Sequence, residues 1–429
     1  MITTILLFTL VSLIAIRVPV SIAIGIATTI ALILGDFPLS VIPRMMIDGL
    51  DTFTLLAVPF FILAGNLMNA GGVTERIFGF AKALFSPIRG GLAQVNVAAS
   101  MIFAGMSGAA LADLAGLGSV EMRAMKEGGY PKNISAAVTL ASCTVGPIIP
   151  PSIVLIVYGL ATNTSIGRLF LGGIIPGFII GLLIMIWISL WVRFKKTTWG
   201  QPEPFVVSDV WKSFKKGALA LFSPILIIGT IIFGVSTPTE VGVIAATYAL
   251  FVGIVSRELT WQKLLNCIKE SMQTSAIIMY IVAVSIVMGW VITMERLPHE
   301  AANAISLYIE NPLLALLIIN IFLIVVGMFL ETLPAILILS PILLPILAPL
   351  GIDPVHFGII VCFNLIIGII TPPMGIGLFV AAKVAETTPE QVFKATIPFF
   401  VPLLIGLVTI TSFPVLTLWL PDLVFGPRP

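Results

Sequence analysis

The stretch GPIIPPS, Gly146 to Ser152, places three prolines and a glycine inside one of the most apolar parts of the chain. A proline at position i lacks an N–H and clashes with the carbonyl of residue i−4, so Pro150 and Pro151 predict a broken helix. The break frees the carbonyls of Gly146 and Pro147 from helical hydrogen bonds. These oxygens need other partners wherever water is absent, and this need constrains the fold.

The composition places this broken helix in a lipid bilayer. The chain has 429 residues, of which 59% are hydrophobic and only 10% are charged, and apolar stretches of spanning length recur from end to end. A soluble globular protein is excluded by these proportions. We therefore predict an all-α polytopic membrane protein with one membrane domain, whose apolar N-terminal segment is retained as a span.

Other chemistry-bearing residues are few and scattered. Cys143, Cys267 and Cys362 lie far apart in or beside apolar runs, a pattern typical of neither a disulfide framework nor a metal site. We expect His299 and His356 to lie outside the broken helices. No convergent catalytic set is visible, so we predict that the protein is not an enzyme. The net charge of +2 arises from loop Lys and Arg and does not indicate nucleic-acid binding.

The proline pair belongs to an internal repeat. Pro150-Pro151 recurs as Pro372-Pro373, an offset of 372 − 150 = 222 residues, and the same offset relates Gly146 to Gly368 and Gly105 to Gly327. Glycines and prolines are the residues that match, and biased apolar composition does not align these by chance. We predict two structural repeats, residues 1–196 and 217–429, joined by a cytoplasmic linker over residues 197–216.

Each repeat is expected to contain the same series of elements. Two spans meet at a proline turn, an amphipathic stretch lies in the interface, and a third span follows. A re-entrant hairpin comes next, for which a kinked single span is the alternative, and then the broken helix. The hairpins are predicted at about 93–125 and 313–349, and the broken helices at about 132–163 and 355–385.

The distribution of basic residues predicts the orientation. If each hairpin returns to its own side, each repeat crosses the membrane five times and the second repeat is inverted relative to the first. Placing the linker in the cytoplasm puts most loop Lys and Arg inside and both termini outside, as the positive-inside rule requires. Broken helices beside hairpin tips are how secondary transporters build cation sites from carbonyls and hydroxyls, and oxygen ligands favour Na⁺ over a transition metal.

Four segments resemble a known family: GMSGAALADLAGLG, GPIIPPS, STPTEVGVIAATYAL and GIITPPMG. The chain is similar over nearly its whole length to the large, DctM-like M subunit of tripartite ATP-independent periplasmic (TRAP) transporters, of the unfused type. The resemblance implies an elevator-type, sodium-driven importer of organic acids such as sialic acid or C4-dicarboxylates, in the bacterial inner membrane. It also implies two partners, a small four-helix Q-type membrane subunit and a periplasmic P-type substrate-binding protein, and no organic cofactor.

Matching positions give candidate sodium ligands. In the second half we expect carbonyls of Gly327, Gly368 and Met374 with the hydroxyl of Thr371. In the first half, the internal repeat indicates a second set, in which Ser107 supplies the hydroxyl because Thr371 aligns with Ile149. This set is Gly105, Ser107, Gly146, Ile149 and Ser152.

Candidate substrate groups come from the helix breaks and from intramembrane polar residues. Pro150, Pro151, Pro372 and Pro373 are expected to face the substrate at helix N-terminal ends, which favour anions. Asp113 is interpreted first as a helix cap, and Glu331 as a cap or a proton site. Asn66, Asn96 and Asn364 either face the cavity or join helices through hydrogen bonds.

The mobile transport unit is predicted to comprise residues 93–161 and 313–384. Three alternatives stay open. One is a stand-alone sodium- or proton-coupled carboxylate transporter, the second is a membrane enzyme, and the third is a channel.

Overall fold

The computed structural model describes residues 2–16, 18–195, 197, 199–295, 311–373 and 375–427. Every regular element within these ranges is a helix, which confirms the predicted all-α class. The first half contains α1 (Ile2–Ala15), α2 (Val20–Leu34), α3 (Val41–Leu50), η1 (Phe53–Leu56), α4 (Ala57–Ala70), α5 (Val73–Phe85), α6 (Leu92–Ser107), α7 (Ala110–Ala115), α8 (Leu117–Glu127), α9 (Lys132–Cys143), α10 (Ile153–Thr162) and α11 (Ile166–Lys195).

The second half is helical in the same way. It contains α12 (Val207–Ile232), α13 (Pro238–Val255), α14 (Trp261–Met294), α16 (Pro312–Gly327), α17 (Thr332–Leu347), η2 (Ala348–Leu350), α18 (Pro354–Ile369), α19 (Ile376–Ala385), α20 (Pro389–Thr396), η3 (Ile397–Phe399), α21 (Phe400–Ser412) and α22 (Val415–Phe425).

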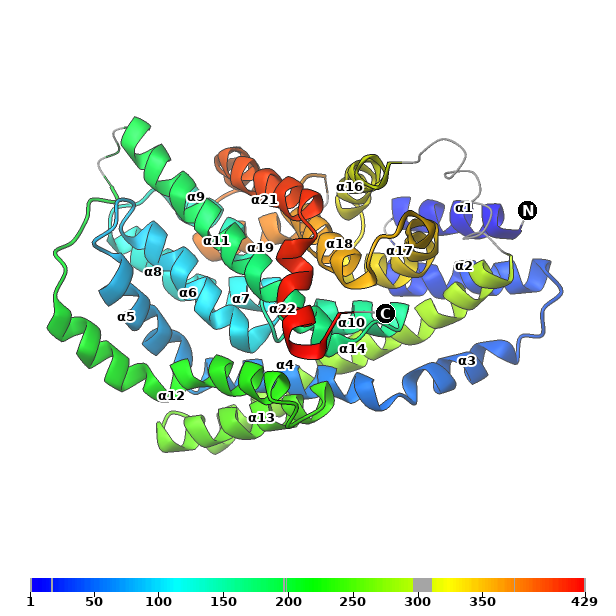
Figure 1. The fold of residues 1–429 in the computed structure, drawn as a ribbon, viewed down its shortest axis with the longest axis horizontal. Helices are drawn as coiled ribbons and strands as arrows, with labels where there is room; N and C mark the ends of the chain where they lie inside the picture. The colour runs from blue at the N-terminus through cyan, green and yellow to red at the C-terminus, as the bar shows by residue number, and fades with distance from the viewer. Residues whose placement is uncertain are drawn as a thin grey trace.

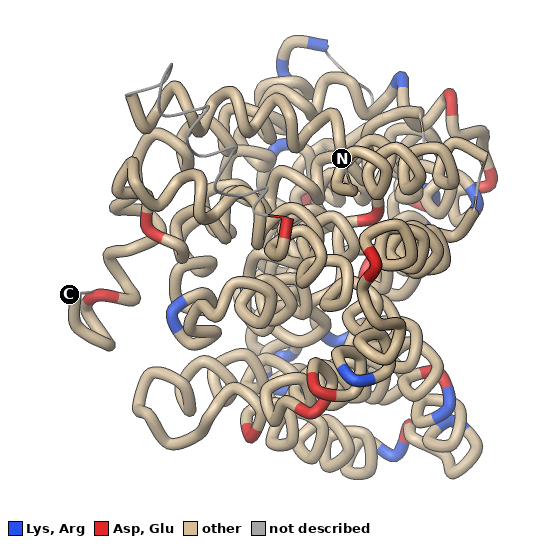
Figure 2. The backbone as a smooth tube through the Cα atoms, turned by 90° about the vertical axis from the view of Figure 1, so that its right-hand side faces the viewer, with Lys and Arg blue, Asp and Glu red and all other residues tan. Residues whose placement is uncertain are grey.

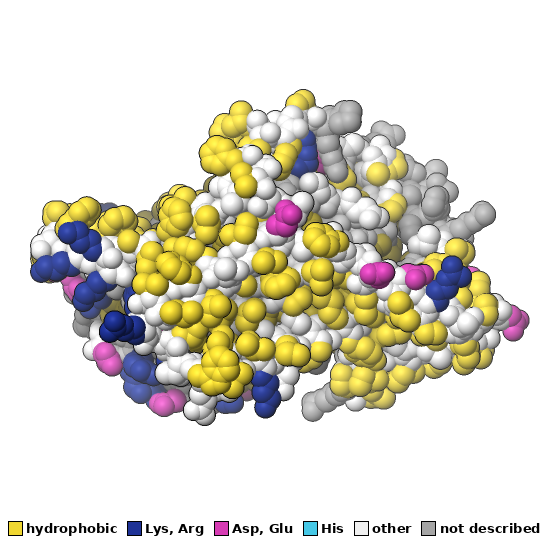
Figure 3. Space-filling view, turned by 90° about the horizontal axis from the view of Figure 1, so that it is seen from below, with side chains coloured by type: hydrophobic (Ala, Val, Ile, Leu, Met, Phe, Trp, Pro, Cys, Tyr) yellow, Lys and Arg dark blue, Asp and Glu magenta, His cyan; other side chains and the backbone are white. Residues whose placement is uncertain are grey.

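Helix length and surface chemistry identify a multi-pass membrane protein. Seven helical segments of the described chain are long and apolar enough to cross a membrane. Figure 3 shows a broad field of hydrophobic side chains on one face, with Lys and Arg gathered at its left end. In Figure 2, long stretches of the tube carry no charged residue. Charges are thus kept from much of the length of the helices, as a hydrocarbon environment requires.

Helix breaks occur at both proline pairs. In the first half α9 ends at Cys143 and α10 begins at Ile153, and in the second half α18 ends at Ile369 and α19 begins at Ile376. Each break follows a helix pair that is itself interrupted, α6 by the turn before α7 and α16 by the turn before α17. The peptide bonds Pro150–Pro151 and Pro372–Pro373 are both cis.

The two halves interlock at these breaks. α10 of the first half packs on α17 and α18 of the second, and α19 of the second half packs on α7 and α9 of the first. Along the lower edge of Figure 1, α4 packs on α13 and α14, and α14 also packs on α2 and α3. The interrupted helices therefore form a mixed core with an outer layer beside it.

Two predicted segments continue into neighbouring helices. The amphipathic stretch of the second half is continuous with the following span, because α14 runs over 34 residues without an interruption. The first half separates the same two parts at Asp51 and Thr52, where the backbone leaves the helical region between α3 and η1. The predicted linker is also partly helical, since α12 begins at Val207.

Candidate functional site: a cavity between the helix breaks

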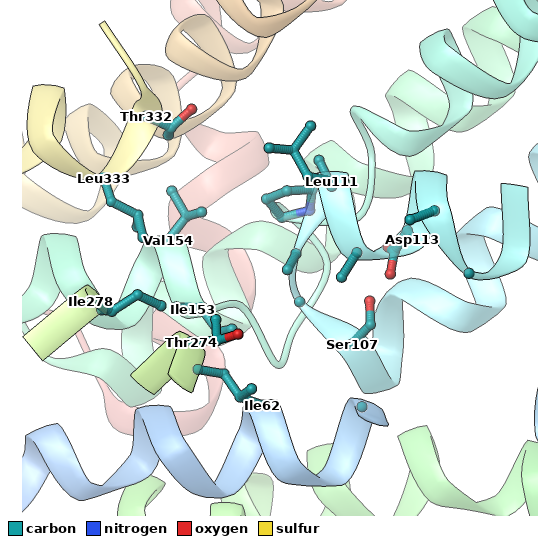
Figure 4. A pocket seen from close by; sticks show the side chains of 18 of the residues that line it. Ile62, Ser107, Leu111, Asp113, Ile153, Val154, Thr274, Ile278, Thr332 and Leu333 are labelled. Carbon is teal, nitrogen blue, oxygen red and sulfur yellow. The ribbon is translucent and has the colours of Figure 1, made fainter. Parts of the chain in front are cut away.

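A cavity of about 600 Å³ lies where the two halves meet. Its wall comes from the turn between α6 and α7, the first break, the first residues of α10 and α17, and the end of α18. The opposite side comes from α4 and α14. Figure 4 shows side chains from these elements pointing into one space. The cavity thus touches both predicted parts of the mobile unit and the outer layer.

The first helix turn packs directly against the first break. A methyl group on Gly108 would collide with the carbonyl of Pro151, and one on Gly105 would lie 3.7 Å from the carbonyl oxygen of Pro150. Gly108 also has a φ of 62°, a left-handed conformation that favours glycine. Gly108 is therefore required for this close approach, which places the turn after Ser107 against Ser152, whereas a methyl group on Gly105 would be crowded by Pro224 of α12 at 2.8 Å.

Two hydroxyl groups of the first half have different surroundings. The Ser107 side chain is 7% exposed, and its Oγ has no hydrogen-bond partner among the described residues. Ser152 is the N-cap of α10, where its Oγ accepts from Leu155 N at 3.1 Å and donates to the carbonyl of Pro147. Ile149 turns its side chain toward Gly177 of α11. Ser152 Oγ keeps one lone pair, and Ser107 Oγ faces the carboxylate of Asp113.

In the second half, the end of α16 and the end of α18 approach each other through their backbones. A Cβ on Gly327 would lie 3.2 Å from the Cα of Gly368. Thr371, 9% exposed, follows directly, and its Oγ1 donates to the carbonyl of Ile367 at 2.8 Å, which leaves its lone pairs free to accept. Met374 lies outside the described residues. Three of the four predicted ligands in this half therefore lie at one junction.

Three carboxylates line the cavity, and one of them was not foreseen. Asp113 and Glu331 were candidates, whereas Glu270 on α14 was missed because its stretch was assigned to the interface. Glu270, Thr274, Ile277, Ile278 and Ile281 all line the cavity at the spacing of one helix face. That periodicity is the signal that could have found Glu270. No Lys, Arg or His is among the described residues that line the cavity.

Asp113 does not cap a helix, so the first interpretation of this residue was wrong. It is the fourth residue of α7, whose N-cap, Ala109, makes no side-chain hydrogen bond. The Asp113 side chain is 1% exposed and its Oδ1 has no partner among the described residues. A methyl on Gly146 would lie 2.6 Å from Oδ2, and Figure 4 shows Ser107 and Asp113 pointing toward each other. The carboxylate thus joins the α6–α7 turn to the first break.

Glu331 occupies the N-cap position of α17 and makes no capping hydrogen bond through its side chain. It is exposed to the cavity instead.

The four prolines of the breaks do not line the cavity, in contrast to the prediction. Pro147 lines it, together with Ile153 and Val154, the first two residues of α10. Thr332 and Leu333 occupy the same positions at the start of α17 and also line it. The first N–H groups of a helix have no intrahelical acceptor. Two helix N-termini, rather than the prolines themselves, therefore face this space.

The asparagines divide between the two interpretations. Asn66 lines the cavity and donates to Ser271 Oγ at 2.8 Å. Asn364 is fully buried away from it and donates to Asn320 Oδ1 at 2.9 Å, so it joins α18 to α16. Asn96 is buried between helices and donates to Thr139 Oγ1 at 2.7 Å. Of these three, only Asn66 lines the cavity, and Asn69 on the same helix lines it as well.

His356 lies inside a broken helix, which corrects the expectation that both histidines lie outside. It is in the first turn of α18, where Nδ1 is 2.9 Å from Thr417 Oγ1. His299 lies outside the described residues. Cys143, Cys267 and Cys362 are buried and unpaired. Within the described ranges no cluster of His, Cys, Asp and Glu has metal-binding composition.

An ion-pair cluster joins the two halves at the surface. Glu386, which follows α19, accepts from Lys132 Nζ at 3.0 Å and from Lys126 Nζ at 3.4 Å. The hydrogen bond from Lys132, together with the positive charge of Lys126, lowers the pKa of Glu386. Burial, in contrast, raises the pKa of Tyr130 to about 12 in the turn between α8 and α9.

Comparison with known proteins identifies the relatives of this arrangement. The family model of the tripartite ATP-independent periplasmic transporter, DctM component, matches residues 7–416. The chain is 43% identical to the sialic acid TRAP transporter large permease protein SiaM of Vibrio cholerae, over 89% of this chain and 90% of that protein. It is 39% identical to the C4-dicarboxylate TRAP transporter large permease protein DctM of Pseudomonas aeruginosa, over 87% of each. The YdaH transporter of Alcanivorax borkumensis has a similar fold, with a TM-score of 0.61, 17% identity and 89% of each chain covered.

Proposed function

Since the chain belongs to the DctM component family of tripartite ATP-independent periplasmic transporters, we propose that it imports an organic acid anion together with sodium ions. In this proposal it is the large subunit of an assembly in the bacterial inner membrane. A separate small membrane subunit and a periplasmic substrate-binding protein complete the assembly. The cavity between the two helix breaks is the observation that carries the proposal.

Oxygen atoms of the right kind support sodium as the coupling ion. The buried Ser107 Oγ has no partner in the described structure, and it lies on the turn that packs against the first break. In the second half, Thr371 and the glycine pair 327 and 368 supply a hydroxyl and backbone carbonyls at one junction. Hydroxyl and carbonyl oxygens suit a hard cation, and these sets leave out Cys and His ligands.

The charge of the cavity supports coupled binding of the two ligands. When ionised, Asp113, Glu270 and Glu331 repel an anion, and no cationic side chain of the described lining compensates for them. Sodium ions bound near the two turns would reduce this repulsion, so each ligand favours the binding of the other. The N-termini of α10 and α17 then offer free N–H groups to the carboxylate of the substrate.

The packing supports an elevator motion. The interrupted helices of both halves, residues 93–161 and 313–384, interlock and would move as one body. α4, α13 and α14 would stay fixed on the other side of the cavity. The sequence offset of 222 residues supports two inverted repeats, in which each half supplies one cation site.

A carboxylate-bearing organic acid is the substrate class that we infer. The two relatives named above are a sialic acid and a C4-dicarboxylate permease, and both substrates carry carboxylates. A stand-alone carboxylate transporter, coupled to sodium or to protons, is the alternative.

Uptake of labelled sialic acid and succinate into proteoliposomes tests the assembly. The vesicles contain this chain with its small subunit, and the sodium gradient and the binding protein are added or left out. We expect uptake only when both are present. Uptake by this chain alone would favour the stand-alone transporter, and uptake driven by a pH gradient without sodium would contradict sodium coupling.

The variant Thr371→Val tests the ion site. It removes the hydroxyl and keeps the shape of the side chain, and the loss of a hydrogen-bond-like contact to a charge costs about 1.5–3 kcal/mol. We expect the sodium concentration for half-maximal uptake to rise roughly 10- to 100-fold. Thr396→Val is the matched control, because Thr396 is also buried and donates to a carbonyl one turn earlier at 2.8 Å. An unchanged sodium requirement in Thr371→Val would remove Thr371 from the site.

A further inference from the structure

A second buried carboxyl group lies behind the cavity. Glu121 on α8 is 0% exposed, and it does not belong to the cavity lining. Ser100 Oγ of α6 lies 3.4 Å from its Oε1, whereas its Oε2 has no partner among the described residues. None of the ion pairs found between described residues includes Glu121. A buried, unpaired carboxylate is costly, so this group needs a proton or another positive charge.

A hydrogen-bonded chain connects Glu121 to α6 and α9. Ser100 Oγ lies 3.0 Å from Ser142 Oγ, and Ser142 Oγ donates to Asn96 Oδ1 at 2.7 Å. The amide of Asn96 then donates to Thr139 Oγ1 at 2.7 Å. All five side chains are at most 2% exposed. The hydrogen-bonded chain is therefore enclosed by protein in this conformation.

Counting donors shows that a proton on Glu121 lets every link of this chain have a donor. A serine hydroxyl has one hydrogen, so Ser100 donates either to Glu121 or to Ser142, but not to both. If Glu121 is a carboxylic acid, it can donate to Ser100 and Ser100 to Ser142, while Ser142 donates to Asn96 Oδ1 or to the Thr139 carbonyl at 2.9 Å. If Glu121 is ionised, Ser100 must turn toward it, and one link of the chain loses its donor.

The electrostatic surroundings are consistent with a proton rather than a counter-charge. Asp113 of α7 and the buried thiol of Cys143 on α9 are ionisable side chains that interact with Glu121, and neither can supply a positive charge. α6 has no ionisable residue. The other ionisable residues on helices packed against α8 cannot serve as the counter-charge of Glu121. Arg76 on α5 is paired with Glu258, and the rest are exposed: Glu75 and Lys82 on α5, Lys132 on α9 and Lys383 on α19.

The internal repeat shows that the fold does not require an acid at this position. The offset of 222 relates Glu121 to residue 121 + 222 = 343, which is Leu343, a buried residue of α17. Ser142 corresponds in the same way to Asn364. The second half thus packs a hydrocarbon side chain where the first half packs a carboxyl group.

We propose that Glu121 is a proton-binding site inside the first half. It holds a proton as a neutral carboxylic acid in the conformation described here, and that proton sets the direction of the hydrogen-bonded chain from α8 through α6 to α9. When the proton leaves to water, the carboxylate keeps the electron pair and Ser100 turns to donate to it. Protonation of Glu121 therefore regulates how α8 is held against α6 and α9. This site uses none of the proposed sodium ligands.

Infrared spectroscopy of the full chain with its small subunit in lipid membranes tests the proposal directly. We expect wild-type protein to show the carbonyl-stretching band of a protonated carboxylic acid, and Glu121→Gln to lose one such band. Glu127→Gln, an exposed acid at the end of the same helix, is the matched control and keeps the band. Glu121→Asp retains a carboxyl group, so its band should shift in frequency rather than disappear; this variant keeps the test open if Glu121→Gln fails to fold.

The pH dependence separates a proton site from a permanently neutral acid. The Glu121 band should decrease as the pH rises within the range where the protein stays folded, and the pH profile of uptake should change in Glu121→Gln but not in Glu127→Gln. An identical spectrum for wild type and Glu121→Gln would overturn the proposal. A band that never responds to pH, or identical uptake profiles, would overturn it too, because Glu121 would then be only a packing residue. Uptake by the wild-type protein without a sodium gradient would refute the proposed coupling without affecting the infrared result.

Discussion

Replacing Gly368 by alanine would introduce a steric clash at the proposed second sodium site. Its new methyl carbon would lie 2.5 Å from the carbonyl oxygen of Gly327 and 2.6 Å from the Gly327 Cα. Carbon and oxygen atoms do not approach so closely, so α18 and the end of α16 must separate. Backbone is the obstacle on both sides, and no flexible side chain can move to relieve the contact.

The size of the effect follows from the cost of overpacking. An extra methyl group in a packed core costs about 1–3 kcal/mol. If this cost falls on the sodium-bound arrangement, sodium affinity drops roughly 5- to 150-fold. Gly289→Ala is the control, because Gly289 is also inside a helix and a Cβ there would have nothing within 4 Å. That change should leave sodium binding unaltered and add up to about 1 kcal/mol to helix stability.

Sodium-dependent uptake and sodium-dependent thermal stabilisation measure this difference. We expect Gly368→Ala to require more sodium in both assays, while Gly289→Ala matches wild type. If folded Gly368→Ala protein has the sodium dependence of wild type, the close approach of these two glycines does not form an ion site, and the assignment of their carbonyls as ligands is refuted.

Three further changes test the packing of the chain. The lysine partners of Glu386 lower its pKa. Their stabilisation of the fold is complete above the pKa of an unfolded glutamate and is lost as the pH falls through the lowered pKa of the folded protein. In Glu386→Gln the melting temperature should therefore no longer show the decrease that this cluster causes at acidic pH. Arg168→Met removes an ion pair with Asp422 at 2.8 Å and a hydrogen bond to the backbone carbonyl of Gly426. We expect a loss of about 1–3 kcal/mol and faster hydrogen exchange in α22, since Asp422 is partly exposed; unchanged exchange would show that other contacts hold α22. Thr237→Ala removes one side of the capping box at the start of α13 and should cost about 1 kcal/mol in thermal unfolding, whereas no loss would mean that the turn is held by packing.

Helix breaks were the part of this structure that the sequence predicts best. Proline has a fixed local effect, so the pair at residues 150 and 151 and the pair at 372 and 373 identify the interrupted helices without any knowledge of tertiary contacts. The repeat offset then locates the glycines at 105 and 327, whose close approach to the breaks is seen in the structure. The capping box of Thr237 and Glu240 is also local, because both residues lie within one turn of the start of α13.

Side-chain direction and helix continuity could not be predicted as well. Asp113 has the position of a first-turn acid, but tertiary packing turns its carboxylate toward Gly146. Glu270 was missed because an amphipathic stretch fits both an interfacial helix and a helix that lines a polar cavity. Glu121 was missed because its surroundings come from distant parts of the chain: its partner Ser100 on α6 and Ser142 on α9, which bonds to Ser100, each lie 21 positions away.

Because α14 is uninterrupted, its length is constrained during evolution of the cavity wall that it forms. Its 34 residues extend about 50 Å, longer than the hydrocarbon thickness of a membrane. Its first half carries Glu270 and Thr274 in the cavity, and its second half packs Met288 and Val291 among α1 and α2. Inserting one residue between these parts would rotate one relative to the other by about 100°. A change in the length of α14 would therefore misalign the cavity wall and the contact with α1 and α2 at the same time. In the first half, the turn between α3 and α4 separates the corresponding two parts, so a change in length there need not affect both.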